Sequence, residues 1–306
     1  MAISRQQLVK ELEPGLNALF GLEYKRYDSE HEEIYAKESS DRAFEEEVML
    51  SGFANAYVKP EGSAVAFDNA QETYTARYTN ETVALAFALT EEAMEDNLYD
   101  RLASRYTKAL ARSMSNAKEV KGAAPLNNGL PAIAAGTAFQ TGDGQNLFST
   151  AHPTIAGTVS NTLATQADLN ETSLEQALID IAAMTDERGL RIAAKAVKMI
   201  IPSANQFNAE RLMKSQGRTQ TADNDINAIN SMGMVPQGYR VNNFLTDADS
   251  WYLITDVPNG MKMFSRTPLT TSMEGDFDTG NVRYKARERY AFGASDFRGI
   301  YGVEGA

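Results

Sequence analysis

Apolar side chains recur at helical spacing in two stretches of the chain. In residues 4–25 they predict an amphipathic helix that Pro14 and Gly15 interrupt. In residues 90–122 an apolar or aromatic residue returns about every fourth position, with Thr90 as the N-cap. This spacing predicts a helix of about 28 residues, or roughly 40 Å at 1.5 Å per residue. Such a helix is longer than most helices of globular domains.

The pattern changes to strand-like alternation between residues 55 and 89. The runs TYTARYT (73–79) and VALAFAL (83–89) predict strands, and residues typical of turns lie around them. The first part of this stretch has few large apolar residues, so it has no core of its own. An isolated two-stranded ribbon is marginal in water. We therefore expect this extended excursion to pack against something else.

In the second half of the chain, residues that typically begin and end helices and strands predict a compact α/β unit. Thr172 and Glu175 form a capping-box pattern at the start of a helix, and Gly189 predicts its end. The run KAVKMIIP (195–202) predicts a buried strand that stops at its proline. A second helix over 203–215 opens with another Ser-to-Gln capping box, and two further strands follow, the second containing the only tryptophan.

A stretch near the C-terminus, VRYKARERYAFGASDFRGIYG (282–302), alternates basic and aromatic residues. In a strand, successive side chains point to opposite faces. One face would carry the basic residues Arg283, Lys285, Arg287 and Arg289. The other would carry Val282, Tyr284, Ala286 and Tyr290, with Glu288 breaking the apolar side. The basic face could contact nucleic acid or an acidic partner, and a solvated strand face is the alternative.

Composition narrows these options. The chain has 306 residues, 43% of them hydrophobic, which suffices for one large domain or two modest ones. A net charge of -12 and an isoelectric point near 4.8 argue against a general nucleic-acid binder. Acidic residues are dense before the first predicted strands and include Glu45, Glu46 and Glu47. Such a run is typical of a solvated face, or of an arm that orders against a partner.

Some sites and compartments can be set aside. The chain has no cysteine, which excludes disulfides, thiolate metal sites and a cysteine nucleophile. No apolar run approaches the roughly 20 residues of a membrane span, and the first residues lack the apolar core of a signal peptide. We therefore expect a protein without membrane contact that is made in the cytoplasm.

Candidate catalytic residues are few. The only histidines are His31 and His152. Ser149 lies close to His152 in sequence, so a hydrolase that uses them as nucleophile and base is an alternative function. No nucleophile-elbow pattern surrounds Ser149. The chain has no HExxH, Walker or GxGxxG motif, and TDADSW lacks the glycine and glutamate of a calcium loop. We expect no catalytic residue, cofactor or metal.

The order of these parts resembles the HK97-fold major capsid proteins of tailed bacteriophages, and it is most similar to Mu-like major head subunits. Three passages carry the resemblance. They are MTDERGLRIAAKAVKMIIPSANQFNAERLMKS (184–215), LFSTAHPTIAGTVSN (147–161), and DSWYLITDVPNGMKMFSRTPL (249–269) followed by RYKARERYAFGASDFRGIYG (283–302). The likeness spans nearly the whole chain, and the order of the passages is more specific than any one of them.

The resemblance implies an α+β, HK97-like capsid fold with four parts. These are an N-arm (1–47), an extended β E-loop (48–88), a P-domain (89–129 and 263–306) with a spine helix at 90–118, and an α/β A-domain around the capsomer axis (130–262). No long coiled-coil scaffolding segment precedes the arm, which implies a separate scaffolding protein or none. Lys59 lies in the E-loop range without an identifiable asparagine partner, so covalent cross-linking is not expected.

The implied function is a structural, non-enzymatic head subunit. It would self-assemble into the hexamers and pentamers of an icosahedral phage shell, in the bacterial cytoplasm, and would enclose double-stranded DNA by non-specific proximity. Portal, scaffolding and decoration proteins would be its other partners. In such a shell the basic face at 283–289 becomes a candidate contact with Glu45, Glu46 and Glu47 of a neighbour. A tail-tube or sheath subunit is the self-assembling alternative.

Overall fold

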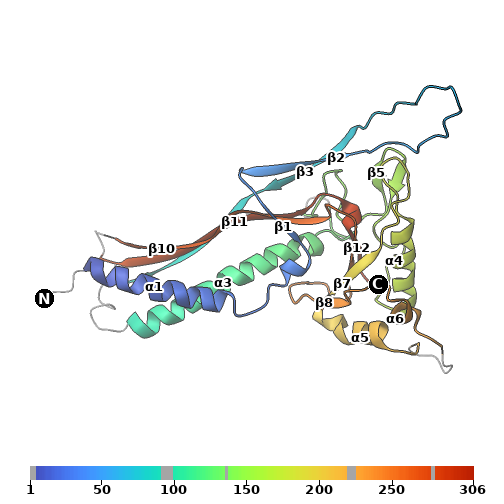
Figure 1. Cartoon of the computed structure of the whole chain (residues 1–306). Helices are drawn as coiled ribbons and strands as arrows, with labels where there is room; N and C mark the ends of the chain where they lie inside the picture. The colour runs from blue at the N-terminus through green and yellow to red at the C-terminus, as the bar shows by residue number, and fades with distance from the viewer. Residues whose placement is uncertain (1–4, 91–98, 135–136, 219–224, 277–279) are drawn as a thin grey trace.

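A long sheet of four strands runs through the elongated part of the molecule in the computed structural model of the chain (Figure 1). The structure describes residues 5–90, 99–134, 137–218, 225–276 and 280–306. The two longest strands, β10 (Met261–Gly275) and β11 (Val282–Ala294), form an antiparallel pair. At one edge β1 (Ala36–Ser39) pairs with β10 in parallel. At the other edge β4 (Glu81–Leu89) pairs antiparallel with β11.

Two long helices, α1 (Arg5–Tyr24) and α3 (Tyr99–Asn127), lie along one face of this sheet (Figure 1). Leu16 and Phe20 of α1 meet Met114 of α3 and Tyr284 of β11 in one buried cluster. The cluster forms because the apolar positions of both helices repeat every three or four residues and those of β11 repeat every second residue.

Both helices differ from the sequence prediction at their prolines. Pro14 lies inside a continuous α1, where an interruption was predicted. α3 continues to Asn127 and contains Pro125, although the spine helix was predicted to end at 118. Packing explains the differences, because each proline costs one helical hydrogen bond while the helices bury Leu16, Phe20 and Leu126. The predicted start of the second helix includes residues 91–98, which lie outside the described residues.

A two-stranded ribbon leaves the sheet at an angle and ends in a projecting loop (Figure 1). Its strands are β2 (Phe44–Leu50) and β3 (Glu72–Thr79), and residues 51–71 form the loop. The ribbon and loop are the extended excursion that the sequence predicts. The next strand, β4, returns to the long sheet, although the predicted E-loop range extends to residue 88.

The other end of the molecule is a compact α/β unit with a sheet of order β12-β9-β7-β8. Its strands are β12 (Ile300–Val303), β9 (Trp251–Thr255), β7 (Ala196–Ile201) and β8 (Tyr239–Val241). The helices around it are α4 (Glu171–Ala183), α5 (Gln206–Lys214) and α6 (Ala228–Met232). A small hairpin joins β5 (His152–Thr154) to β6 (Gly157–Val159). Short 3-10 turns are η1 (His31–Glu33), η2 (Ser203–Asn205) and η3 (Phe297–Gly299).

The helix boundaries in this unit correct three sequence predictions. The Asn170 side-chain oxygen accepts a hydrogen bond from the Ser173 backbone N–H, and the Ser173 hydroxyl accepts one from the Asn170 backbone N–H. This pair therefore forms the capping box in place of Thr172 and Glu175. α4 ends at Ala183, and Gly189 lies in a later turn with a positive φ of 82°. The predicted Ser203 box is a 3-10 turn without a side-chain cap. Asn and Ser caps compete closely with Thr, so sequence pattern alone chose the wrong start.

A shared core joins the two ends of the molecule. It includes Leu126 of α3, Tyr252 of β9 and Tyr290 of β11. At the same junction the backbones of Gly260 and Gly299 touch, since a Cβ on Gly260 would lie 2.7 Å from the Gly299 Cα. Only glycine allows backbones to approach this closely. The two ends are therefore fixed to each other by buried packing.

Candidate intersubunit contact surfaces

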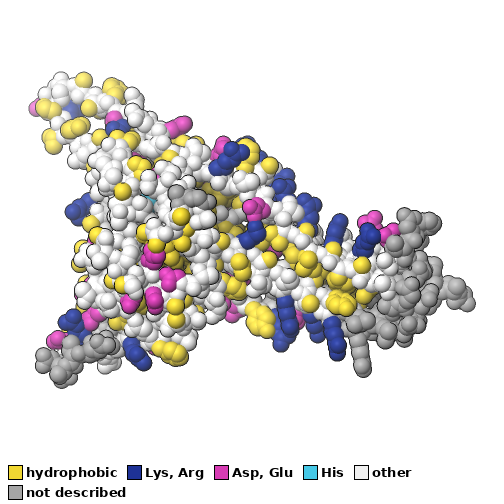
Figure 2. Space-filling view, turned by 180° about the vertical axis from the view of Figure 1, so that it is seen from behind, with side chains coloured by type: hydrophobic (Ala, Val, Ile, Leu, Met, Phe, Trp, Pro, Cys, Tyr) yellow, Lys and Arg dark blue, Asp and Glu magenta, His cyan; other side chains and the backbone are white. Residues whose placement is uncertain are grey.

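The basic face of β11 points away from the helices, as the alternation predicts. Arg283, Lys285 and Arg287 are exposed and Arg289 is half-buried. The intervening residues, from Val282 to Tyr290 on the other face, are buried against the helices. Figure 2 shows Lys and Arg side chains in rows along both long edges of the elongated part of the molecule.

Small side chains flank this basic row on both neighbouring strands. On β4, Ala84, Ala86 and Ala88 lie opposite Arg287, Lys285 and Arg283. On β10, Thr270 and Ser272 lie opposite Arg287 and Lys285. Arg283 forms an ion pair with Asp276. The side chains of Lys285 and Arg287 have no ion-pair partner among the described residues. Around Lys285 and Arg287 the surface is therefore flat and basic, whereas Glu274 of β10 lies opposite Arg283.

The acidic trio on β2 is largely occupied within the same chain. Glu47 accepts from Lys262 at 2.5 Å, and Glu45 accepts from the Ser40 hydroxyl at 2.8 Å. Burial lowers the pKa of Lys262, but the adjacent carboxylates of Glu47 and Glu38 outweigh it and hold that pKa above its usual value. Glu47 therefore fastens the ribbon to β10, which local sequence could not indicate. Among the described residues, no ion pair joins the trio to the basic face of the same subunit.

Glu46 is the member of the trio whose carboxylate is not held by a short hydrogen bond within the chain. Its carboxylate lies 3.8 Å from Arg77, and both side chains are about half exposed. An exposed pair of this kind contributes little to stability. Glu46 is therefore free to exchange partners, unlike Glu47.

The loop after β2 carries apolar side chains that have almost no cover in the subunit. Phe67 is 97% exposed and Val58 is 96% exposed, and Phe53, Tyr57 and Val65 are exposed as well. Yellow side chains cluster on this projecting loop in Figure 2. An apolar surface of this kind on a soluble chain usually marks an interaction site.

A buried ion pair links β11 to the helices below it. Glu288 is 2% exposed and accepts from Lys118 of α3 at 3.2 Å. The hydroxyl of Tyr24 of α1 lies 3.5 Å from the same carboxylate. Burial, followed by the charge of Glu288, raises the pKa of Tyr24. The sequence marked Glu288 as a break in the apolar face, but its partners are distant in sequence and could not be inferred.

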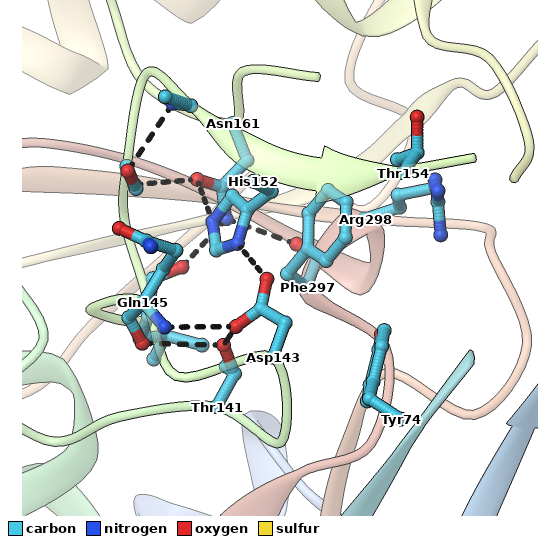
Figure 3. Close-up of polar contacts among 12 residues, drawn as sticks. Tyr74, Thr141, Asp143, Gln145, His152, Thr154, Asn161, Phe297 and Arg298 are labelled. Atoms are coloured by element: carbon cyan, nitrogen blue, oxygen red, sulfur yellow. Dashed lines mark hydrogen bonds and ion pairs between the residues drawn. The ribbon is translucent and has the colours of Figure 1, made fainter. Parts of the chain in front are cut away.

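His152, the candidate base, is a buried structural residue (Figure 3). Its Nδ1 lies 2.6 Å from an Asp143 carboxylate oxygen and its Nε2 lies 3.1 Å from the Asn161 side-chain oxygen. That amide is oriented by its own NH₂ group, which donates to backbone carbonyls of Leu147 and Phe297. Both ring nitrogens are therefore engaged by other side chains, Asp143 on one side of the ring and Asn161 on the other.

The surroundings of this ring also fix its partner Asp143. Burial pushes the pKa of Asp143 upward, but hydrogen bonds from His152 and Thr141 outweigh it and hold the pKa below its ordinary value. The ring of Phe297 stacks on His152 with centroids 3.9 Å apart. The Ser149 hydroxyl accepts from the backbone of Ala151. The ring has no free nitrogen to take a proton from Ser149, so the pair is not a nucleophile and base.

Arg298 occupies a second buried polar cluster beside the ribbon. Its guanidinium donates to Glu187 at 2.7 Å, to Asp296 at 3.2 Å and to the backbone carbonyl of Thr185 at 2.8 Å. Arg298 is only 3% exposed. Burial raises the pKa of Asp296 above its ordinary value, although the charge of Arg298 opposes that rise.

The described residues hold neither a metal site nor a membrane span. They contain no cluster of three His, Asp or Glu side chains arranged to hold a metal ion. None of their helices is long and apolar enough to cross a membrane. The surfaces that remain are the flat basic face and the apolar loop.

Comparison with known proteins gives these surfaces a context. A family model described as "Phage capsid protein" matches residues 73–303. This chain belongs to the phage capsid protein family. The match covers β4, β10 and β11 of the long sheet, α3 and the α/β unit. No curated protein sequence matches the chain.

Solved capsid structures share the fold of this phage capsid protein at low sequence identity. The capsid of Myoviridae phage XM1 has 13% identity and a TM-score of 0.55, over 89% of each chain. The capsid of an empty GTA particle has 15% identity and a TM-score of 0.55, over 91% of this chain and 90% of that one. A virus-like particle from Pyrococcus furiosus has 10% identity and a TM-score of 0.53, over 95% of this chain and 98% of that one.

These matches confirm the predicted α+β, HK97-type capsid fold. Family membership confirms the predicted structural, non-enzymatic role and the place of the protein in the virion. The hydrolase alternative was wrong, as the geometry of His152 also indicates.

Proposed function

We propose that this capsid protein is the major subunit of an icosahedral head that assembles from hexamers and pentamers around double-stranded DNA. The fold supports a shell subunit. The observation that carries the proposal is the projecting loop, whose Val58 and Phe67 are almost fully exposed. Such a loop has no function in an isolated subunit, whereas in a lattice it can be covered by a neighbour.

The predicted domain names fit the observed parts as an assignment. α1 and the segment through β1 would be the N-arm, and the ribbon with residues 51–71 would be the E-loop. The long sheet with α3 would be the P-domain, and the α/β unit would be the A-domain around the axis. In this assignment the E-loop is the segment that overlaps neighbouring copies, because α1 of the arm packs on α3 and β11 of its own chain.

We assign the flat basic face as the surface that the loop of a neighbour covers. Small side chains beside Lys285 and Arg287 leave room for a chain to lie close to the sheet. Aromatic rings of the loop can stack on the cations, and its acidic residue Glu61 can pair with them. Glu46 is the other candidate acidic contact, because Glu45 and Glu47 are occupied within the chain.

Electron microscopy of the purified, expressed full chain tests the proposal. We expect closed shells, and a persistent monomer under all conditions would contradict the proposal. A variant with Arg287 and Arg289 changed to Glu should stay folded but lose shells. Arg105→Glu is a matched control, because Arg105 is an exposed residue of α3 on the helical side. Equal shell yields from the two variants would show that the basic face is only solvated.

The finer identity of the head is a further part of the proposal. The passage at 147–161 and the order of the parts support a Mu-like subgroup. Portal, a separate scaffolding protein and a decoration protein would be additional partners, and DNA would be enclosed without specific contacts. A tail-tube or sheath subunit predicts tubes, so particle shape separates that alternative from a head.

A further inference from the structure

The outer edge of β4 is an unpaired strand edge. β4 is the last strand of the sheet, and β11 is its only partner in the described part of the chain. Apart from the ladder with β11, no backbone hydrogen bond joins residues 82–89 to another described segment. Every second residue of an edge strand points its N–H and C=O away from the sheet. β4 therefore presents a row of backbone donors and acceptors that no described residue binds.

This edge lacks the features that usually protect an edge strand. β4 pairs with β11 in one unbroken register over nine residues and contains no proline, lysine or arginine. The opposite edge differs, because β1 covers β10 only at Lys262–Ser265. Beyond that point β10 has two register shifts and Pro268. Bulges and prolines discourage strand addition, and long flat apolar edges invite it. This contrast indicates that β4 is the sheet edge at which another strand can add.

Apolar surface beside the same edge is also uncovered. Leu85 of β4 is 47% exposed and Tyr106 of α3 is 48% exposed. The Tyr106 ring lies 5.8 Å from that of Phe87, so the patch continues from β4 onto the helix. Large residues of β4 face the helices and its alanines face the basic side. A strand added here would bury this patch if its own large residues pointed the same way.

The loop contains a segment with this pattern. Residues 64–67 read Ala-Val-Ala-Phe, so large and small side chains alternate as they do along β4. Val65 and Phe67 are exposed, and the backbone groups of 64–67 make no hydrogen bond to the described residues. Alternation with period two lets such a segment place both large residues on one face.

We propose that residues 64–67 of a second copy add as a strand to the outer edge of β4. Val65 and Phe67 would cover Leu85 and Tyr106, while Ala64 and Ala66 would extend the flat basic face. This inference rests on the proposed overlap of neighbouring subunits. It adds that backbone hydrogen bonds, as well as side-chain packing, hold the loop in place.

Hydrogen exchange measured residue by residue tests the contact in two states of the full chain. In free subunits, amide protection along 82–89 should alternate, because only every second N–H bonds to β11. In assembled shells we expect the unprotected amides to slow by about 100-fold or more, and alternating protection to appear in 64–67. The open part of β10, Leu269–Glu274, is the internal control and should keep its pattern.

The outcomes separate this contact from the proposed function. A chain that never assembles would overturn both. Shells in which β4 keeps alternating protection would overturn strand addition and leave the shell subunit intact. Full protection of β4 without protection of 64–67 would overturn the loop as the occupant.

A matched pair of variants gives an independent readout. Val65→Ser should raise the subunit concentration needed for shells by about tenfold, because each contact loses one buried valine. Val58→Ser makes the same change in the same loop outside the proposed strand, so its effect should be smaller. Equal effects of the two substitutions would contradict the proposed register.

Discussion

The guanidinium of Arg298 is buried between the carboxylates of Glu187 and Asp296, so its removal should destabilise the subunit. Replacement by Met removes the donor to Glu187, Asp296 and the Thr185 carbonyl. Both carboxylates would stay buried without a counter-charge. Removing one partner of a buried pair costs about 3–5 kcal/mol. We expect the free energy of unfolding of the subunit to fall by about that amount.

The assay and its control both come from the chain itself. Trp251 is the only tryptophan and is fully buried, so its fluorescence reports urea-induced unfolding of the α/β unit. Arg283→Met is the matched control, because Arg283 is 62% exposed and pairs with Asp276 at the surface. That change should cost about 0–1 kcal/mol. Similar costs for the two variants would refute the argument from burial.

The loss should also depend on pH in a defined direction. The pKa of Asp296 is already raised by burial, and Arg298 opposes the rise, so its removal raises that pKa further. A carboxyl with a raised folded-state pKa contributes stability below its unfolded pKa and loses it as pH rises through the folded value. The difference between the variant and the parent should therefore shrink as pH falls towards about 4, where carboxyls protonate. A pH-independent difference would contradict this account.

Three further changes test other parts of the fold by the same unfolding assay. Gly299→Ala should destabilise by about 3 kcal/mol or more, because its Cβ would meet the Gly260 backbone, which cannot move aside as a flexible side chain can. Gly21→Ala is its control. Nothing lies near the Cβ position of Gly21 inside α1, so this change should stabilise by up to about 1 kcal/mol. Lys262→Met should cost about 3 kcal/mol by leaving Glu47 without its buried cation, and a neutral result would show that the ribbon is held by its other contacts. His152→Gln should cost about 1–3 kcal/mol through loss of the buried hydrogen bonds to Asp143 and Asn161, and an unchanged midpoint would show that these bonds do not stabilise the fold.

Sequence periodicity was sufficient where one face of an element is buried along its whole length. Alternation along β11 gave both faces correctly, because the period of a strand is fixed by its backbone. The run KAVKMIIP gave β7, and its proline gave the end of the strand, because proline cannot continue the ladder. The order of such elements was sufficient to indicate the capsid fold.

Interactions between distant parts of the chain could not be predicted from local sequence patterns. Glu47 was grouped with its acidic neighbours, but Lys262 decides its role. Pro14 was predicted to interrupt α1, but contacts with α3 keep the helix continuous. In each case the deciding group lies far away in sequence. Patterns within a window cannot include the energy of such a contact.

The apolar loop has a thermal consequence for any particle built from this chain. Association that covers Phe67 and Val58 removes apolar surface from water and carries a negative heat-capacity change. That driving force weakens on cooling, because hydration of apolar groups costs less free energy in the cold. Particles that depend on this loop should loosen near freezing and tighten again at room temperature. The particles would then dissociate into subunits most easily on ice, and the subunits would reassemble on warming.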